Sequence, residues 1–367
     1  MRKVCVNAGG KTYDIHIEAG LFKRLPHIFR SKYSGKKLAV VSDHNVFELY
    51  GKEFIRQLEP EGFCIIPIVF EAGEKSKNLA TLNSIYNALA DGAFTKSDIT
   101  VALGGGVTGD MAGLAAATFL RGMGYIQIPT TLLAMVDSSI GGKVAVDMPQ
   151  GKNLIGAFYQ PDAVYTDPEI LKSLSDRQLS DGMAELLKHG IIKDAALYNN
   201  LVHDDDIYDR KILSAKLDEY IYTSCSIKRS IVEEDEQDIG IRQLLNFGHT
   251  VGHAIERVQG YSGLSHGEAI SIGMIVITML TEKMGLTKKG ESGKIIKALE
   301  KYDLPIKWPD LNISEIIDAI AIDKKNRSGR ITVSYIEEIG QGRLIEFDLK
   351  ELEDRIHGTL TDFIKTL

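Results

Sequence analysis

The stretch ITVALGGGVTGD, residues Ile99–Asp110, decides the fold, because an apolar run leads directly into three consecutive glycines. The apolar residues predict a buried strand, and the residues that follow the glycines predict a helix. Gly104, Gly105 and Gly106 carry no Cβ that would hold an anion away from the backbone N–H groups, and Gly109 lets the helix pack close to the sheet. A strand, a glycine turn and a helix in this order bind phosphate groups, so a dinucleotide is the first ligand to consider.

The spacing Gly104-x-Gly106-x-x-Gly109 fits the dinucleotide fingerprint, but glycines after a strand also form ordinary tight turns. The fingerprint usually has an acidic ribose ligand about 20 residues later. Here that region reads YIQIP, residues 125–129, and holds no carboxylate. A ribose contact must therefore come from earlier strand ends, where the candidates are Asp43, Asn45, Glu74 and Lys77. Asp43 and Asn45 are equally consistent with ordinary helix capping.

Composition limits the class of protein. A chain of 367 residues with 44% hydrophobic content can bury a large core, and its length favours two domains. The net charge of -7 and the scattered lysines and arginines argue against a nucleic-acid partner. The three cysteines are far apart and form neither a disulfide framework nor a metal motif. No apolar run approaches the ~18 residues that span a bilayer, so we expect a cytoplasmic enzyme without membrane contact.

The pattern of short β-rich runs and helical runs divides the chain into two parts. Alternation in the first half predicts an α/β domain of parallel strands with crossover helices over residues 1–167. After Pro168 the periodicity is helical, and we expect a mainly helical domain over residues 168–367 with one late strand at Ile331–Tyr335. The strands expected in the first half are Lys3–Cys5, Thr12–Ile17, Leu38–Val41, Ile65–Phe70, Ile99–Leu103, Tyr125–Ile128 and Val164–Thr166.

The second half contains a histidine pattern that suggests a metal site. In LLNFGHTVGHAIE, His249 and His253 lie four residues apart on one helical face, and His266 follows in SHGEAISIG. The glutamate of an HExxH metalloprotease is missing. Histidines at this spacing also hydrogen-bond to backbone groups or carboxylates, and the spacing leaves both interpretations open.

A three-ligand catalytic metal site would need a carboxylate as well. In GMAELLKHG, Glu185 and Lys188 lie one turn apart on an otherwise apolar helix, which is an unusual place for charge unless it has a partner. The alternative is a surface i,i+3 salt bridge worth a few tenths of a kcal/mol.

The run VDSSIGGKVAVDMPQGKNLIGAFYQP, residues 136–161, places several polar and charged residues among glycine-rich turns. They are Asp137, Lys143, Lys152 and Asn153, preceded by Arg121, Thr130 and Thr131. Cations in glycine-bounded loops at the carboxyl ends of parallel strands indicate an anionic substrate. A long surface loop with solvated lysines is the alternative, although such a loop is costly to order.

Taken together, these motifs resemble the 3-dehydroquinate synthase family of sugar-phosphate cyclases over nearly the whole chain. The resemblance is carried by GGGVTGDMAG, RGMGYIQIPTTLLAMVDSSIGGK, GKNLIGAFYQP, DGMAELLKHG, RQLLNFGHTVGHAIE and SHGEA. It implies a Rossmann-like NAD-binding α/β domain followed by a mainly α-helical domain that carries one divalent metal, zinc or cobalt.

The resemblance also implies roles for individual residues. The metal ligands would be Glu185, His249 and His266, and His253 would contact substrate or carry a proton. NAD+ would contact Asp43, Asn45, Glu74, Lys77, Gly104, Gly105, Gly106, Val107, Asp110, Thr130, Thr131, Lys143 and Lys152. Substrate binding and catalysis would involve Asp137, Lys143, Lys152, Asn153, Lys188, Lys228, Arg242, Asn246 and one of Lys324 and Lys325. Arg121 would reach a phosphate from the neighbouring subunit, which implies a homodimer.

The implied reaction converts 3-deoxy-D-arabino-heptulosonate 7-phosphate to 3-dehydroquinate and phosphate, the second step of chorismate and aromatic amino acid biosynthesis. Transient oxidation by NAD+ precedes phosphate elimination, re-reduction and aldol closure. Related cyclases differ mainly around the segments that here read Gly141-Gly142-Lys143 and Lys152-Asn153. The remaining alternatives are a metal-dependent alcohol or glycerol dehydrogenase and a non-catalytic NAD-binding regulator.

Overall fold

The computed structural model describes residues 1–204, 213–324 and 329–366. The chain packs into two compact units, Met1–Leu174 with Ile207–Glu236, and Ser175–Asp206 with Gln237–Leu367. Helix α8 (Leu213–Glu234) therefore belongs to the first unit, where it packs against the strands β1 (Arg2–Ala8) and β2 (Lys11–Ile17). Each unit therefore consists of two separate segments of the chain. The boundary expected from sequence, between residues 167 and 168, divides the chain at one position instead.

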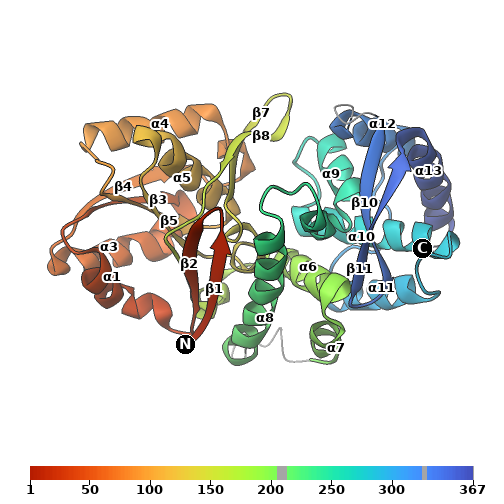
Figure 1. Cartoon of the computed structure of the whole chain (residues 1–367), viewed down its shortest axis with the longest axis horizontal. Coiled ribbons are helices and arrows are strands. Elements are labelled where there is room, and N and C mark those ends of the chain that lie inside the picture. The colour runs from red at the N-terminus through yellow and green to blue at the C-terminus, as the bar shows by residue number, and fades with distance from the viewer. Residues whose placement is uncertain (205–212, 325–328, 367) are drawn as a thin grey trace. The chain divides into compact units, whose positions relative to one another are not determined.

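The first unit is built on a seven-stranded sheet with the order β1-β2-β9-β6-β5-β3-β4 (Figure 1). All seven strands expected in the first half of the chain are present. The bounds of the remaining five are β3 Lys37–Asp43, β4 Cys64–Phe70, β5 Ile99–Gly104, β6 Gly124–Pro129 and β9 Ala163–Thr166. The pairs from β2 to β4 across the sheet are parallel, which confirms the α/β class.

One strand pair differs from the expectation of parallel strands, because β1 and β2 are antiparallel. Only Gly9 and Gly10 connect them, with φ of 60° and 72°. Two residues with positive φ form the tight turn that fits the twist of a hairpin, and no crossover helix can be built from them.

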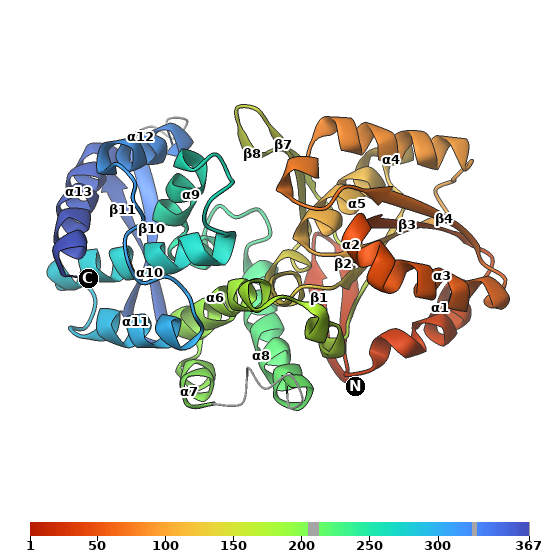
Figure 2. The ribbon, with the colours of Figure 1, turned by 180° about the vertical axis from the view of Figure 1, so that it is seen from behind.

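Helices cover both faces of this sheet. Figure 2 shows α1 (Leu25–Tyr33) and α3 (Lys52–Leu58) on one side, and α4 (Leu79–Asp91) and α5 (Gly106–Thr118) on the other. Helix α5 is buried along most of its length, as is strand β5, from which it continues. The glycine turn between these two elements is therefore held by the core of the unit.

The glycine-rich run after Asp137 forms a hairpin, β7 (Lys143–Met148) and β8 (Gly151–Phe158), where the sequence analysis expected turns. Residues Val144, Ala145 and Val146 are buried, and β7 packs on α5. At Gly113 of α5, an added Cβ would lie 2.4 Å from Val144, so the absence of a side chain allows this packing. Tertiary packing thus orders a segment whose glycine content is typical of a loop.

The second unit is mainly helical and includes one hairpin. Its helices are α6 Asp176–Lys193, α7 Ala195–His203, α9 His249–Val258, α10 His266–Lys283, α11 Glu291–Lys301, α12 Ile313–Lys324 and α13 Leu349–Thr366. Helix α10 packs against α6, α9, α11 and α13. The expected strand near Ile331 is β10 (Arg330–Glu338), and it pairs with β11 (Gln341–Asp348), which the sequence analysis did not anticipate. Within the described ranges, no helix has the length and apolarity to cross a membrane.

Candidate functional site

The glycine turn of the first unit forms an open helix N-terminus. Gly105 is the N-cap of α5, and, being glycine, it supplies no side-chain cap to the first turn. The first N–H groups of a helix have no intrahelical partner and lie at the positive end of its dipole. An added Cβ at Gly104 would lie 2.4 Å from Thr108 Oγ1, and one at Gly106 would lie 3.2 Å from Ser138 Oγ. A side chain at Gly104 would therefore clash with Thr108. The N–H groups of the turn fit a phosphate of a dinucleotide.

Two threonines follow the end of β6, beside this turn. The Thr130 N–H donates to Gly104 O at 3.0 Å, while its hydroxyl is buried and has no hydrogen-bond partner among the described residues. Thr131 Oγ1 accepts a hydrogen bond from Ala134 N at 3.1 Å. Because buried hydroxyls are rarely left unpaired, the Thr130 hydroxyl is a second feature that fits a polar ligand at this turn.

The acidic candidates at the ends of β3 and β4 differ in their contacts. Asp43 Oδ1 accepts from Val46 N at 3.1 Å and caps the short helix α2 (His44–Val46), as the capping interpretation predicts. Asn45 is exposed on the same turn. Glu74 pairs with Lys152 Nζ at 3.2 Å, which joins the residues after β4 to the tip of the β7–β8 hairpin.

Lys77 is a buried lysine that contacts two polar side chains from different elements. Its Nζ lies 2.5 Å from Asp110 Oδ2 and 2.6 Å from Asn153 Oδ1, and the side chain is only 7% exposed. Burial raises the pKa of Asp110 to about 6, although Lys77 opposes that shift. Burial also works against the charge on Lys77, but Asp110 and Glu74 outweigh it and raise the pKa of the lysine. The sequence offered these residues separately, and the fold brings them together.

Asp137 is joined to the helix that returns from the second half of the chain. Lys228 Nζ, on α8, lies 2.6 Å from Asp137 Oδ1 and 2.7 Å from the Asp137 carbonyl oxygen. The two residues are 91 positions apart in sequence. Lys228 and Asp137 were both expected to bind substrate, and their ammonium and carboxylate groups form an ion pair.

Arg121 lies apart from these clusters. It is exposed, and no hydrogen bond or ion pair joins its side chain to another described residue. Leu120 and Arg121 have φ of 52° and 65°. Positive φ in two consecutive non-glycine residues is unusual and is associated with functional sites. Lys143, also exposed, begins β7.

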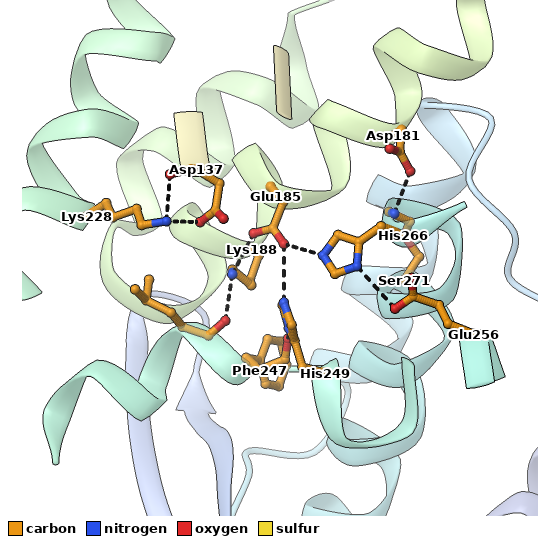
Figure 3. Close-up of polar contacts among 12 residues, drawn as sticks. Asp137, Asp181, Glu185, Lys188, Lys228, Phe247, His249, Glu256, His266 and Ser271 are labelled. Carbon is orange, nitrogen blue, oxygen red and sulfur yellow. Dashed lines mark hydrogen bonds and ion pairs between the residues drawn. The ribbon is translucent and has the colours of Figure 1, made fainter. Parts of the chain in front are cut away.

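The second unit brings Glu185, His249 and His266 together from three helices (Figure 3). His266 Nε2 lies 3.2 Å from Glu185 Oε1, and His249 Nε2 lies 3.4 Å from the same oxygen. Candidate ligand atoms of the three residues lie within 4.8 Å of one another. One carboxylate oxygen and two imidazole nitrogens form a donor set that suits zinc and other divalent transition metals, so the residues present fit a metal ion.

The other nitrogen of each imidazole faces an acceptor. His249 Nδ1 lies 3.1 Å from Phe247 O, and His266 Nδ1 lies 3.3 Å from Glu256 Oε2. Such outer contacts fix the tautomer that leaves Nε2 available as a ligand. Burial opposes the charge on His266, but Glu185 and Glu256 outweigh it and raise its pKa to about 10. The same carboxylates would attract a dication, whose binding would displace that proton.

The two charged residues of the apolar helix α6, Glu185 and Lys188, are partners of each other, as their position predicted. Lys188 Nζ lies 2.5 Å from Glu185 Oε2 and donates to Leu245 O at 2.6 Å, and both charged side chains are buried. The surface salt-bridge interpretation is therefore wrong. Burial would raise the pKa of Glu185, but Lys188 and the two histidines hold it well below its usual range.

Close contact between α9 and α10 sets the distance between the two histidines. An added Cβ at Gly273 of α10 would lie 1.9 Å from the backbone oxygen of Gly248, and one at Gly252 would lie 3.0 Å from Ile270. Gly248, with φ of 81°, precedes His249 at the start of α9. Glycine at these positions lets one helix backbone approach the other, which places His249 beside His266.

His253 lies beside this cluster, and the other residues predicted from sequence lie elsewhere in the second unit or outside the described residues. The His253 ring is 5.1 Å from that of His249, and His253, Glu256 and His266 form a second group whose candidate ligand atoms lie within 4.8 Å. Arg242 is buried and Asn246 half-buried in the short 3-10 helix Ile241–Asn246. The side chain of Lys324 and all of Lys325 lie outside the described residues.

Sequence reasoning missed the residues that support the site. Glu256 follows His253 by three positions, but nothing in the sequence shows that its carboxylate meets His266. Gly273 is one of many glycines in the chain and lies far in sequence from Gly248. Asp147, whose Oδ1 accepts from Asn153 N at 2.8 Å, sits in a hairpin that was expected to be turns. Only the tertiary contacts distinguish these residues.

Comparison with known sequences identifies similar proteins over almost the full length. A family model described as 3-dehydroquinate synthase N-terminal matches residues 67–181, and one described as 3-dehydroquinate synthase C-terminal matches residues 182–326. The 3-dehydroquinate synthase of Clostridium kluyveri is 45% identical over 96% of this chain and 97% of its own. That of Clostridium acetobutylicum is 44% identical over 96% of this chain and 98% of its own.

Solved structures with the same fold include two sugar-phosphate cyclases. A 2-deoxy-scyllo-inosose synthase, complexed with carbaglucose-6-phosphate, NAD+ and Co2+, matches with a TM-score of 0.84 and 25% identity over 97% of this chain and 100% of its own. The 2-epi-5-epi-valiolone synthase of Streptomyces hygroscopicus, with NAD+ and Zn2+ bound, matches with a TM-score of 0.88 and 25% identity, covering 96% and 97% of the two chains. A probable glycerol dehydrogenase from Sinorhizobium meliloti shares the fold, with a TM-score of 0.66 at 16% identity over 96% of this chain and 97% of its own.

Proposed function

The chain belongs to the 3-dehydroquinate synthase family, and from that premise we propose that it converts 3-deoxy-D-arabino-heptulosonate 7-phosphate to 3-dehydroquinate and phosphate. The observation that carries the proposal is the convergence of Glu185, His249 and His266 in a chain that also holds an open glycine turn. The relatives named for this activity are 44–45% identical, whereas the two other cyclases are 25% identical. This difference favours dehydroquinate formation over the related cyclisations.

The cofactors are NAD+ and one divalent metal, Zn2+ or Co2+. When bound, NAD+ supplies reversible hydride transfer, and the metal supplies polarisation of a substrate hydroxyl and of the ketone derived from it. We assign NAD+ to the glycine turn and the residues around it, within residues 1–167. We assign the metal to Glu185, His249 and His266, within residues 168–367.

The side chains of the two units have different tasks in the proposed reaction. Lys152, Asn153 and Arg121 hold the phosphate, because two cations and an amide supply donors to its oxygens. Arg242 suits the substrate carboxylate through its bidentate fork. His253 carries a proton, since an imidazole titrates near neutral pH, and the substrate phosphate is the other candidate base.

Assembly and location are part of the same proposal. Arg121 is exposed on a strained turn and has no described partner within its own chain. This supports the homodimer in which it reaches the phosphate held by the neighbouring subunit. The chain acts in the cytoplasm, where the early steps of aromatic amino acid biosynthesis supply its sugar-phosphate substrate.

Phosphate release from the heptulosonate phosphate, followed together with absorbance at the NADH band, tests this function. We expect stoichiometric phosphate and 3-dehydroquinate with a flat NADH band, because each hydride removed is returned in the same turnover. A chelator should abolish turnover, and Zn2+ or Co2+ should restore it. Accumulating NADH without phosphate release would instead identify a net dehydrogenase of the glycerol dehydrogenase type.

A further inference from the structure

The contact between Lys77 and Asn153 fixes the orientation of an amide that the proposed function assigns to the substrate. Lys77 Nζ donates to Asn153 Oδ1 at 2.6 Å. An ammonium group has only donors, whereas an amide has one carbonyl acceptor and one NH2 donor group. The lysine therefore hydrogen-bonds to the side-chain carbonyl oxygen of Asn153, and the NH2 group of Asn153 does not face Lys77.

The backbone around Asn153 is held at the same place. Asn153 has φ of 54°, and its N–H donates to Asp147 Oδ1 at 2.8 Å. The Asp147 N–H donates in turn to the carbonyl oxygen of Lys77 at 2.8 Å. Both the side chain and the main chain of Lys77 thus contact the tip of the β7–β8 hairpin.

Lys77 is itself anchored on the helix that begins at the glycine turn. Its Nζ lies 2.5 Å from Oδ2 of Asp110 on α5, and both side chains are largely buried. A buried ammonium that spends two of its donors on Asp110 and Asn153 is held in one geometry by two elements. Lys77 thus links α5, the helix that begins at the glycine turn, to the tip of the β7–β8 hairpin.

We propose that Lys77 is a positioning residue that presents the NH2 group of Asn153 to an oxygen of the substrate. The inference rests on the proposed function, in which Asn153 binds the phosphate end of the heptulosonate phosphate. It differs from the expectation that Lys77 serves only the adenosine end of NAD+. Lys77 acts on substrate affinity through Asn153, and the two residues operate as one unit.

A double-mutant cycle on substrate KM tests this coupling. The variants are Lys77→Met, Asn153→Gly and the double variant, with glycine chosen because it tolerates the positive φ of residue 153. We expect each single change to raise KM by about tenfold, and the double change to raise it no more than the larger single effect, because residues that act as a unit are not additive. Asn153→Gly should leave the Kd for NAD+, measured by fluorescence titration, unchanged.

Lys37 provides a matched control in the same unit. Its Nζ donates to the carbonyl oxygens of Gly92 and Ala93, away from the hairpin tip. Lys37→Met combined with Asn153→Gly should give the product of the single effects on KM. Should Lys77→Met fail to fold, Lys77→Arg takes its place, since it keeps the positive charge beside Asp110 but replaces the point donor by a planar fork.

The outcomes separate the inference from the proposed function. Multiplicative effects of Lys77 and Asn153 on KM, or an unchanged KM in a folded Lys77 variant, would overturn the inference while the wild type remains an active cyclase. If the wild-type holoenzyme releases no phosphate, the proposed function fails, and the inference that rests on it fails too.

Discussion

His266 Nε2 lies 3.2 Å from Oε1 of Glu185, although 81 positions separate the two residues in sequence. His249 Nε2 approaches the same oxygen at 3.4 Å. Because the second nitrogen of each ring already faces an acceptor, the two Nε2 atoms are left for a shared partner.

His249 and His253 should separate metal binding from turnover. His249→Ala removes a ligand from the buried cluster, so we expect metal affinity to fall by more than about 100-fold and activity to disappear with it. His253→Ala removes an exposed ring and should keep the metal while losing turnover. Elemental analysis of the purified variants, together with phosphate release, measures both effects. Equal loss of metal from the two variants would falsify this division of roles.

Glu256 should matter for the metal without being one of the three ligands. Glu256→Ala removes the acceptor of His266 Nδ1, and loss of such an outer contact typically lowers metal affinity 10–100-fold. Competition with a coloured chelator measures the change. The matched control is Glu291→Ala on α11 of the same unit, which removes a buried carboxylate that pairs with Lys294 of that helix. A similar drop in metal affinity in both variants would indicate general destabilisation instead.

Two glycines of the second unit should respond oppositely to alanine. Gly273→Ala places a Cβ 1.9 Å from Gly248 O, so α9 and α10 must separate, and we expect a loss of about 3 kcal/mol or more in the free energy of unfolding, with loss of metal. Gly293→Ala in α11 meets no atom within 4 Å and should stabilise by roughly 0.5–1 kcal/mol. Urea unfolding compares the two, and a neutral Gly273→Ala would contradict the close packing.

Lys152 should affect substrate more than cofactor. Its Nζ pairs with Glu74 at 3.2 Å, but about a quarter of the side chain stays exposed at the hairpin tip. Lys152→Ala should therefore raise KM for the heptulosonate phosphate and leave the Kd for NAD+ near that of the wild type. Steady-state kinetics and fluorescence titration give the two constants. A collapse of NAD+ affinity would instead place Lys152 in the cofactor site.

Asp110 should make stability depend on pH. Its pKa is raised to about 6 from the usual 3.8, so the folded chain binds this proton more tightly than the unfolded chain. That contribution to stability is complete below about pH 3.8 and is lost as pH rises through about 6. Relative to Asp110→Asn, the wild type should lose on the order of 2 kcal/mol of unfolding free energy from pH 4 to 6.5. Urea unfolding across that range measures the difference, and a constant difference would show that Asp110 is ionised throughout.

The glycine turn after β5 and the alternation of strands and helices could be predicted from sequence, because local pattern encodes them. The hairpin of residues 143–158 could not, since its glycines resemble turns and only packing on α5 orders it. The placement of α8 in the first unit depends on contacts with β1 and β2, which lie some 200 residues earlier in sequence. Such long-range contacts leave no local signal.

For the site, the sequence by itself determined the residue types: a glycine turn for phosphate, paired histidines, and a carboxylate on an apolar helix. The tertiary structure alone decided that Glu185 meets His249 and His266, and that Glu256 supports one of them. It also decided that Lys77 contacts both Asp110 and Asn153. Residue chemistry is a local property of the chain, whereas partnership requires atoms from distant segments to lie within about 3 Å of each other, which only packing of the whole unit brings about.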